Sequence, residues 1–197
     1  MLNLKKLVIA SGNKGKLREI GMLLAPLEIE VVPQSAFNVT EIDEPHPTFV
    51  ENALAKARHA SRQTGLPALA DDSGICVNAL KGAPGVFSAR YAGEPKSDQR
   101  NNMKLVETLE TSADRSAYYY CVIVLLRHAE DPQPVIADGS WHGEIISEPR
   151  GDGGFGYDPH FLLPEFDRTA AELDMNTKNT ISHRGKALAK LIEILRS

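Results

Sequence analysis

The first group of residues that could do chemistry is a glycine- and lysine-rich segment made of Ser11, Gly12, Asn13, Lys14, Gly15 and Lys16. It stands where a short apolar run gives way to a helical pattern. Backbone N–H groups at the start of a helix are unpaired and carry partial positive charge, and glycines let that backbone approach an anion closely. The two lysines add cations, so the segment is a candidate phosphate-binding loop. It lacks the spacing of a Walker A loop and of G-x-G-x-x-G, so a plain glycine turn with solvated lysines is the alternative.

Two adjacent carboxylates, Asp71 and Asp72, end an apolar run in the segment ADDSG. In an extended chain their side chains point to opposite sides, so we expect one to face a site and the other to make structural hydrogen bonds. Mg²⁺ takes one or two protein carboxylates and completes its shell with water and phosphate oxygens. Glu44, in the acidic loop EIDEP, could provide the second carboxylate. The alternative for Asp71 to Gly74 is an acidic turn with a side-chain hydrogen bond.

A third candidate is the segment GDGGFGYDP, residues 151–159, in which four glycines surround Phe155 and Tyr157. Such a loop predicts a close approach of the backbone to another group, and aromatic faces can stack on a nucleobase. A packed loop closed by core aromatics is the alternative.

The fourth candidate is the segment ISHRGKAL, in which Ser182 could cap the last helix and His183 and Arg184 open it. Cations are electrostatically unfavourable at a helix N-terminus, so a ligand anion or a keto oxygen would explain them. Lys178 could join them. A solvated first turn is the alternative.

The elements that must position these segments follow from hydrophobic periodicity. Helical spacing is predicted after Lys16, from Thr48 as a cap to Gly65, over residues 98–109, and around Leu188 near the C-terminus. The predicted strands are Leu7 to Ala10, Glu28 to Val32, Leu66 to Leu80 through the acidic residues, Ala117 to Arg127, and Val135 to Ile146 as its antiparallel neighbour. We find no linker between domains, so the pattern predicts a single domain over residues 1–197, of mixed α/β class with an extended mixed sheet.

Composition narrows the class of protein. With 42% hydrophobic and 24% charged residues, the chain has the composition of a globular protein with a real core. The net charge of −4, without a cluster of basic residues, argues against a nucleic-acid partner. The two cysteines show no metal-ligand spacing, and the apolar runs are too short for a signal peptide or a membrane span, so we expect a cytoplasmic protein.

Taken together, six segments in this order resemble the inosine triphosphate pyrophosphatase family, and most of all its bacterial dITP/XTP pyrophosphatases. The segments are SGNKGK, FVENALAKARHA, ADDSG, GAPGVFSARYAG, GGFGYDP and SHRGKAL. The resemblance covers nearly the whole chain. It implies an α/β fold with an elongated mixed central sheet and flanking helices, two lobes around an active-site cleft, and a homodimer.

The resemblance also implies an activity. Members hydrolyse deaminated purine nucleoside triphosphates (ITP, dITP and XTP) with Mg²⁺, releasing pyrophosphate and leaving the monophosphate. It implies that Ser11 to Lys16 bind the triphosphate, that Asp72 and Glu44 hold the metal, and that Asp72 is the general base. It assigns a substrate contact to Ser73 and the surroundings of the base to Phe155, Gly156, Tyr157, Asp158, Lys178, His183 and Arg184.

Two other functions remain as alternatives. A nucleotide-binding module without catalysis would keep the phosphate loop and the base pocket but would need no carboxylate at Asp72. A Maf-type nucleotide pyrophosphatase would act on a different base, and the segment SHRGKAL favours the deaminated-purine branch over it.

Overall fold

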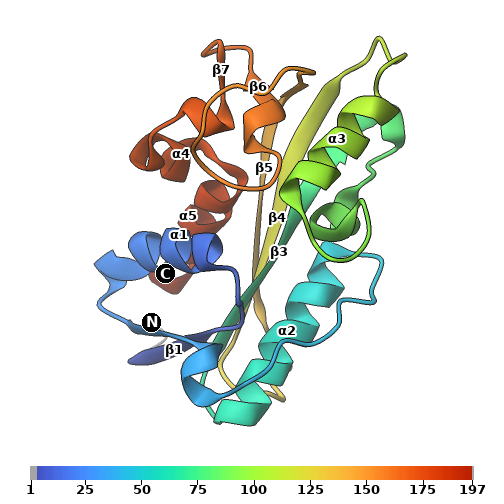
Figure 1. Ribbon diagram of the computed structural model, residues 1–197. Helices are drawn as coiled ribbons and strands as arrows, with labels where there is room; N and C mark the ends of the chain where they lie inside the picture. The colour runs from blue at the N-terminus through green and yellow to red at the C-terminus, as the bar shows by residue number, and fades with distance from the viewer. Residues whose placement is uncertain (1–3, 197) are drawn as a thin grey trace. The chain divides into compact units, whose positions relative to one another are not determined.

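The computed structural model describes residues 4–196. Its strands are β1 (Lys6–Ile9), β2 (Glu30–Pro33), β3 (Ala68–Val77), β4 (Ser116–Leu126), β5 (Val135–Ile145), β6 (Phe161–Leu163) and β7 (Arg168–Thr169). Its α-helices are α1 (Lys14–Leu24), α2 (Phe49–Thr64), α3 (Asp98–Thr108), α4 (Met175–Ile181) and α5 (His183–Arg196) (Figure 1). Short 3₁₀ helices lie at Ala25–Leu27, Gln34–Phe37, Asn78–Leu80, Gly85–Arg90, Asp158–His160 and Ala170–Glu172.

The strands form one seven-stranded sheet in the order β2-β1-β3-β4-β5-β6-β7. At one edge β1 is parallel to both β2 and β3, with Val8 opposite Val32 and Ala68. At the other edge β6 is antiparallel to β5 and to β7. This confirms the predicted mixed α/β class. It also confirms that the strand starting near Val135 lies next to the one starting near Ala117.

The chain divides into two compact units, each built from separate stretches of sequence. Unit 1 comprises the chain up to Asp72, Cys121–Gly139 and the chain from Arg184 on, and unit 2 comprises Ser73–Tyr120 and Ser140–His183. Each unit has its own hydrophobic core. The assignment of residues 1–197 to a single domain stays a prediction.

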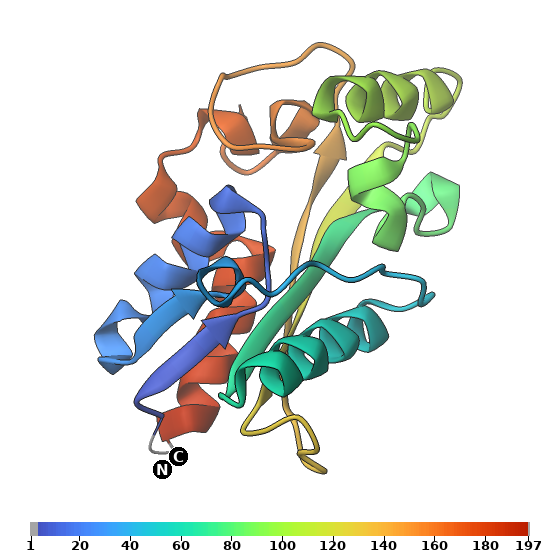
Figure 2. The same ribbon diagram turned by 60° about the horizontal axis from the view of Figure 1, so that its bottom comes forward.

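The core of unit 1 lies between the sheet and two helices. Leu7 and Ile9 of β1 pack in one cluster with Ile20 of α1 and Leu188 of α5, and the two helices run beside each other in Figures 1 and 2. Side chains alternate along a strand, so Val8 points to the opposite face, where α2 contacts β1. Two layers of helix therefore cover the two faces of the sheet in this unit.

Helix α2 is formed as its sequence predicts. Thr48 is its N-cap, and the side-chain oxygen of Thr48 accepts a hydrogen bond from the backbone N–H of Glu51. The helix ends at Gly65, which takes a positive φ of 68°. Its buried face is mostly alanine, which lets the helix lie close to the sheet. Asn52 is buried on the same face.

The core of unit 2 is rich in aromatic side chains. Tyr119 of β4, Trp141 of β5 and Phe161 of β6 pack with Leu105 of α3. Helix α4 and the short strands β6 and β7 lie in this unit and were not expected from the sequence, because each is too short to show a periodic pattern.

Among residues 4–196, no helix is both long and apolar enough to cross a membrane.

Candidate active site

The segment Ser11 to Lys16 leaves β1 and enters α1, as the sequence predicts. Asn13 is the N-cap of α1, and its Oδ1 accepts a hydrogen bond from the N–H of Lys16 at 3.1 Å. The N–H of Asn13 donates to Ser11 Oγ at 3.2 Å, and the N–H of Gly12 donates to the carboxylate of Glu41 at 2.8 Å. A backbone donor of this loop therefore already faces an anionic oxygen, which is the arrangement that a phosphate would use.

Asp71 and Asp72 point to opposite faces of β3. Asp71 shares the face of Leu69, which packs in the core with α1 and α5, while Asp72 shares the face of Ala70 and meets side chains from α2. This confirms the prediction that the two side chains point to opposite sides of the strand.

Asp71 lies in a buried ion network. Its Oδ2 is 3.0 Å from the ammonium of Lys16 and 3.2 Å from a guanidinium nitrogen of Arg184, which also pairs with Glu19. Burial alone would raise the pKa of Asp71, but the charges of Lys16 and Arg184 outweigh it and hold the pKa well below its ordinary value. Asp71 is therefore a fixed anion that ties β3 to α1 and α5.

Asp72 lies in a second network, on the α2 side. The ammonium of Lys56 is 2.5 Å from Glu44 Oε1 and 3.1 Å from Asp72 Oδ1, so two carboxylates share it. Asn52 Nδ2 donates to Asp72 Oδ2 at 3.3 Å, and Asn52 also exchanges hydrogen bonds with the backbone of His46. Asn52 and Lys56 are one helical turn apart and lie on the same face of α2. This face therefore binds both the acidic loop and Asp72.

Burial raises the pKa of Asp72, and the neighbouring charge of Glu44 raises it further, although Lys56 acts in the opposite direction. The pKa of Lys56 is also raised: burial alone would lower it, but the carboxylates around it outweigh burial. Two carboxylates around one cationic centre are a donor set of the kind that Mg²⁺ takes. The position between Glu44 and Asp72 already holds positive charge, so these residues fit a divalent cation.

In unit 2, Asp158 is a buried carboxylate that accepts hydrogen bonds from its own glycine-rich loop, residues 151–159, and from neighbouring elements. It is 3% exposed and accepts hydrogen bonds from Phe155 N at 2.9 Å, Tyr119 Oη at 3.2 Å and Lys178 Nζ at 2.6 Å. The ammonium of Lys178 also lies 4.9 Å from the centre of the Phe155 ring. The sequence places Lys178 twenty residues from Asp158, and the structure brings them into direct contact.

His183 belongs to the same group of residues. Its ring stacks on Tyr119, with centroids 4.7 Å apart and planes at 10°, and Tyr119 in turn donates to Asp158. Tyr157 is buried and donates from its hydroxyl to the carbonyl of Ser88 at 2.8 Å. The residues that the resemblance assigns to the base, Phe155 to Asp158, Lys178 and His183, are therefore neighbours within unit 2.

Two predicted site residues lie at positions in the sequence where the chain passes from one unit to the other. Arg184 follows His183 in the chain but belongs to unit 1, where it pairs with Asp71 and Glu19. This placement favours a structural role for Arg184, and its assignment to the base stays a prediction. Ser73 follows Asp72 in β3 and is the first residue of unit 2.

Sequence reasoning missed Lys56, Asn52, Glu19 and Tyr119. For the first two a signal was present, because Asn52 and Lys56 are polar residues at helical spacing within a face that is otherwise alanine. Glu19 and Tyr119 gave no such signal, since their partners lie 165 and 39 residues away.

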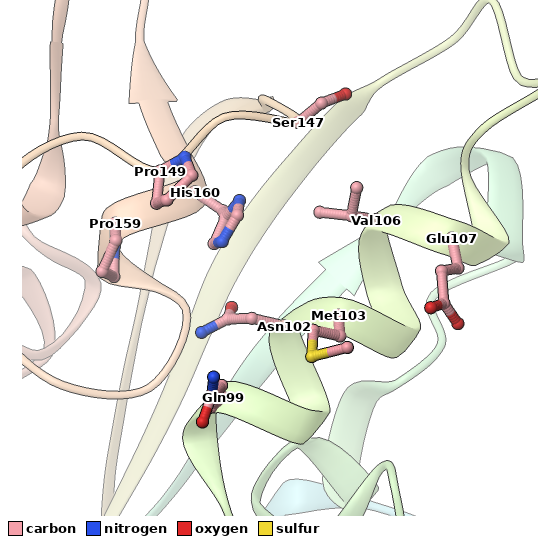
Figure 3. Close-up of a pocket in the computed structure, with 9 residues that line it drawn as sticks. All are labelled: Gln99, Asn102, Met103, Val106, Glu107, Ser147, Pro149, Pro159 and His160. Atoms are coloured by element: carbon pink, nitrogen blue, oxygen red, sulfur yellow. The ribbon is translucent and has the colours of Figure 1, made fainter.

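Unit 2 also contains a pocket of about 490 Å³, lined by α3 and by residues near Pro149 and His160 (Figure 3). None of its lining residues belongs to the predicted site. In the described part of the chain, no group of three or more His, Cys, Asp or Glu side chains comes together as a metal-ligand set. A metal bound by two carboxylates would rely on substrate and water for its other ligands.

Comparison with known proteins places the chain in a family. The sequence model of the Ham1 family matches residues 7–194, so the chain belongs to the Ham1 family. The chain is 73% identical to the dITP/XTP pyrophosphatase of Nitrosomonas europaea, over 98% of this chain and 95% of the relative. It is 64% identical to the dITP/XTP pyrophosphatase of Ralstonia nicotianae, over 98% of each. The structure of a HAM1 protein from Coxiella burnetii matches with a TM-score of 0.92 and 54% identity, covering 98% of this chain and 99% of that one.

Proposed function

We propose that this protein is a nucleoside triphosphate pyrophosphatase that hydrolyses dITP, XTP and ITP to the monophosphate and pyrophosphate. Relatives that match nearly its whole length carry the name dITP/XTP pyrophosphatase. The observation that carries the chemistry is the pair Glu44 and Asp72 around Lys56. A nucleotide-binding module without catalysis would need no carboxylate at Asp72.

The residues of unit 1 would bind the triphosphate and the metal. Backbone N–H groups of the segment Ser11 to Lys16, with Lys14 and Lys16, supply positive charge, which is the main requirement of phosphoryl transfer. Glu44 and Asp72 would hold Mg²⁺, which when bound neutralises charge on the phosphates. Lys56 keeps the two carboxylates together.

Asp72 is the general base of the proposed reaction. It accepts a proton from a water molecule whose oxygen bonds to the α-phosphorus. The bond from the α-phosphorus to the bridging oxygen breaks, and pyrophosphate leaves.

The residues of unit 2 would bind the base. Phe155 offers a ring for stacking, and Lys178 and His183 offer nitrogen groups. Hypoxanthine and xanthine carry a keto oxygen at position 6, where adenine carries an amino donor. Donors at this position would leave the amino group of adenine without a partner, which costs about 1 to 3 kcal/mol for each unmatched group.

The direct test is substrate profiling of the purified protein with Mg²⁺. We expect dITP, XTP and ITP to give monophosphate and pyrophosphate far faster than ATP or GTP. Orthophosphate as the first product, or equal rates on ATP, would refute the proposal. A preference for pyrimidine nucleotides would instead favour a Maf-type activity.

We further propose that the enzyme is a cytoplasmic homodimer that acts on free nucleotides rather than on nucleic acid. The net charge of −4 supports the second part, because a nucleic-acid surface needs clustered basic residues. Light scattering should give twice the mass of one chain, and a monomer at micromolar concentration would contradict the dimer.

A further inference from the structure

Two side chains of α3 hold the backbone of Gly156 from both sides of that residue. The N–H of Gly156 donates to Asp98 Oδ2 at 2.7 Å, and Asn102 Nδ2 donates to the carbonyl oxygen of Gly156 at 2.9 Å. Asp98 and Asn102 are four residues apart, so they lie one helical turn apart on one face of α3. Both backbone hydrogen-bonding groups of Gly156 are thus bound by a single helix.

Helix α3 is a firm support for these contacts. Ser97 is its N-cap, with its side-chain oxygen accepting from the N–H of Arg100. Leu105 and Leu109 anchor it in the core of unit 2, and the neighbouring Asn101 bonds to the backbone of Ala89 and Ala92. Asp98 and Asn102 therefore project from a capped and packed helix rather than from a loop.

Gly156 has a backbone conformation that other residues rarely adopt. Gly156 has a φ of +64°, a conformation that favours glycine, and a Cβ added there would meet no atom within 4 Å. The backbone conformation, and not lack of space, is thus the reason for glycine. Its neighbour Phe155 donates to Asp158 and lies under the ammonium of Lys178. The peptide that joins Phe155 to Gly156 carries the N–H bound by Asp98, so this contact holds the backbone next to the Phe155 ring.

The side-chain amide of Asn102 is suited to donate a hydrogen bond to the carbonyl of Gly156. A carbonyl oxygen can only accept, so the NH₂ group of Asn102 must face Gly156. Asn102 also forms part of the α3 wall of the pocket in Figure 3, opposite Pro149 and His160. Within residues 4–196 its buried Oδ1 has no hydrogen-bond partner.

We propose that Asp98 and Asn102 are positioning residues that set the base-binding loop and, through it, the affinity for the base. This inference rests on the proposed function, in which Phe155 to Asp158 surround the base. Asp98 and Asn102 act through the backbone of Gly156 and need no contact with the substrate.

The test compares Asp98→Ala and Asn102→Leu with the wild-type enzyme. Leucine keeps the volume of Asn102 and removes both its donor and its unsatisfied oxygen. Gln99→Ala is the matched control, because Gln99 lies on the same helix and, within residues 4–196, makes no hydrogen bond to Gly156. Asp98→Asn keeps an oxygen acceptor at the same place and is the conservative variant. The readouts are KM and kcat for dITP, the inhibition constant of inorganic tripolyphosphate, and the thermal midpoint.

Each of Asp98→Ala and Asn102→Leu should raise KM for dITP about ten-fold, the scale of one lost hydrogen bond that involves a charged or buried group. We expect kcat to change less than about three-fold and the tripolyphosphate constant to stay the same, because that inhibitor has no base. Asp98→Asn should recover most of the loss. The double variant should lose less than the product of the single effects, because both residues hold the same peptide.

An unchanged KM in both variants, or an equal loss of tripolyphosphate affinity, would overturn this inference while leaving the proposed function intact. A wild-type enzyme that does not hydrolyse dITP would instead overturn the proposed function itself.

Discussion

The two units use buried aspartates in different ways. In unit 1, Asp72 and Glu44 share the ammonium of Lys56, so two anions lie around one cation. In unit 2, Asp158 is one anion that accepts from Lys178, from a tyrosine hydroxyl and from a backbone N–H. The first arrangement suits a site that takes a further cation and moves a proton, and the second suits a carboxylate that organises its neighbours.

The comparison shows that burial and residue type do not by themselves distinguish the proposed base, Asp72, from Asp158. Asp72 and Asp158 are 5% and 3% exposed, so their burial is nearly the same. What differs is the number of carboxylates that share one ammonium.

The Asp72→Asn variant should have the largest effect on activity. The amide cannot accept the proton of the attacking water, so we expect kcat on dITP to fall about 10³-fold or more. Binding of dITP, measured by calorimetry, should remain detectable. Asp138→Asn, at an exposed ion pair with Lys190, is the control and should keep its activity. Substantial turnover by Asp72→Asn would remove Asp72 from the role of base.

The Arg184→Met variant should have the largest effect on stability. It leaves Asp71 and Glu19 buried without this partner, and breaking such a network costs about 3 to 5 kcal/mol of the free energy of unfolding. Urea denaturation would measure the loss. Arg62→Met breaks an exposed pair with Glu130 and should cost less than about 1 kcal/mol. Equal losses in the two variants would contradict the structural role of the Arg184 network.

The Lys178→Met variant tests the organising role of Asp158. Loss of the ammonium removes a contact to Asp158 and another to the Phe155 ring, so KM for dITP should rise about ten-fold to a hundred-fold. The inhibition constant of inorganic tripolyphosphate should not change, because Lys178 is proposed to bind the base and not the phosphates. Steady-state kinetics would show the difference. A fall in kcat with KM unchanged would mean that Lys178 acts on the phosphates.

The smallest expected effect concerns Asp131, a carboxylate away from the proposed site. It accepts hydrogen bonds from the backbone and side chain of Arg127 and from Gln133 N, in the loop between β4 and β5. The hydrogen bonds from the Arg127 side chain lower its pKa. Its contribution to stability is therefore present above the ordinary aspartate pKa of about 3.9 and is lost as the pH falls below it.

Asp131→Ala should accordingly lower the free energy of unfolding by about 1 to 2 kcal/mol at pH 7 and leave dITP kinetics unchanged. The difference from wild type should shrink between about pH 4 and pH 2, which thermal unfolding at several pH values would show. A difference that grows as the pH falls would contradict this assignment.

Local features of the fold could be predicted from the sequence because they depend on neighbouring residues. The Thr48 cap, the alanine face of α2 and the opposite orientations of Asp71 and Asp72 all follow from spacing of a few residues. Contacts between distant segments could not be predicted in this way. Asp98 and Gly156 are 58 residues apart, and the sequence of neither segment predicts the hydrogen bond between them.

The same limit applied within the site. The sequence suggested Glu44 and Asp72 as metal ligands, but it did not show that Lys56 lies between them. The order of residues along the chain does not show which cation pairs with a carboxylate, because the pairing depends on how α2 packs against β3. The helical spacing marked Lys56 as an unusual residue of α2, but only the folded structure shows that it pairs with both Glu44 and Asp72.

The central claim is that water attacks the α-phosphorus and pyrophosphate leaves. Hydrolysis of dITP in ¹⁸O-labelled water, followed by mass spectrometry of both products, tests it directly. The account predicts one labelled oxygen in dIMP and none in pyrophosphate. Label in pyrophosphate, or labelled orthophosphate released with dIDP, would contradict it.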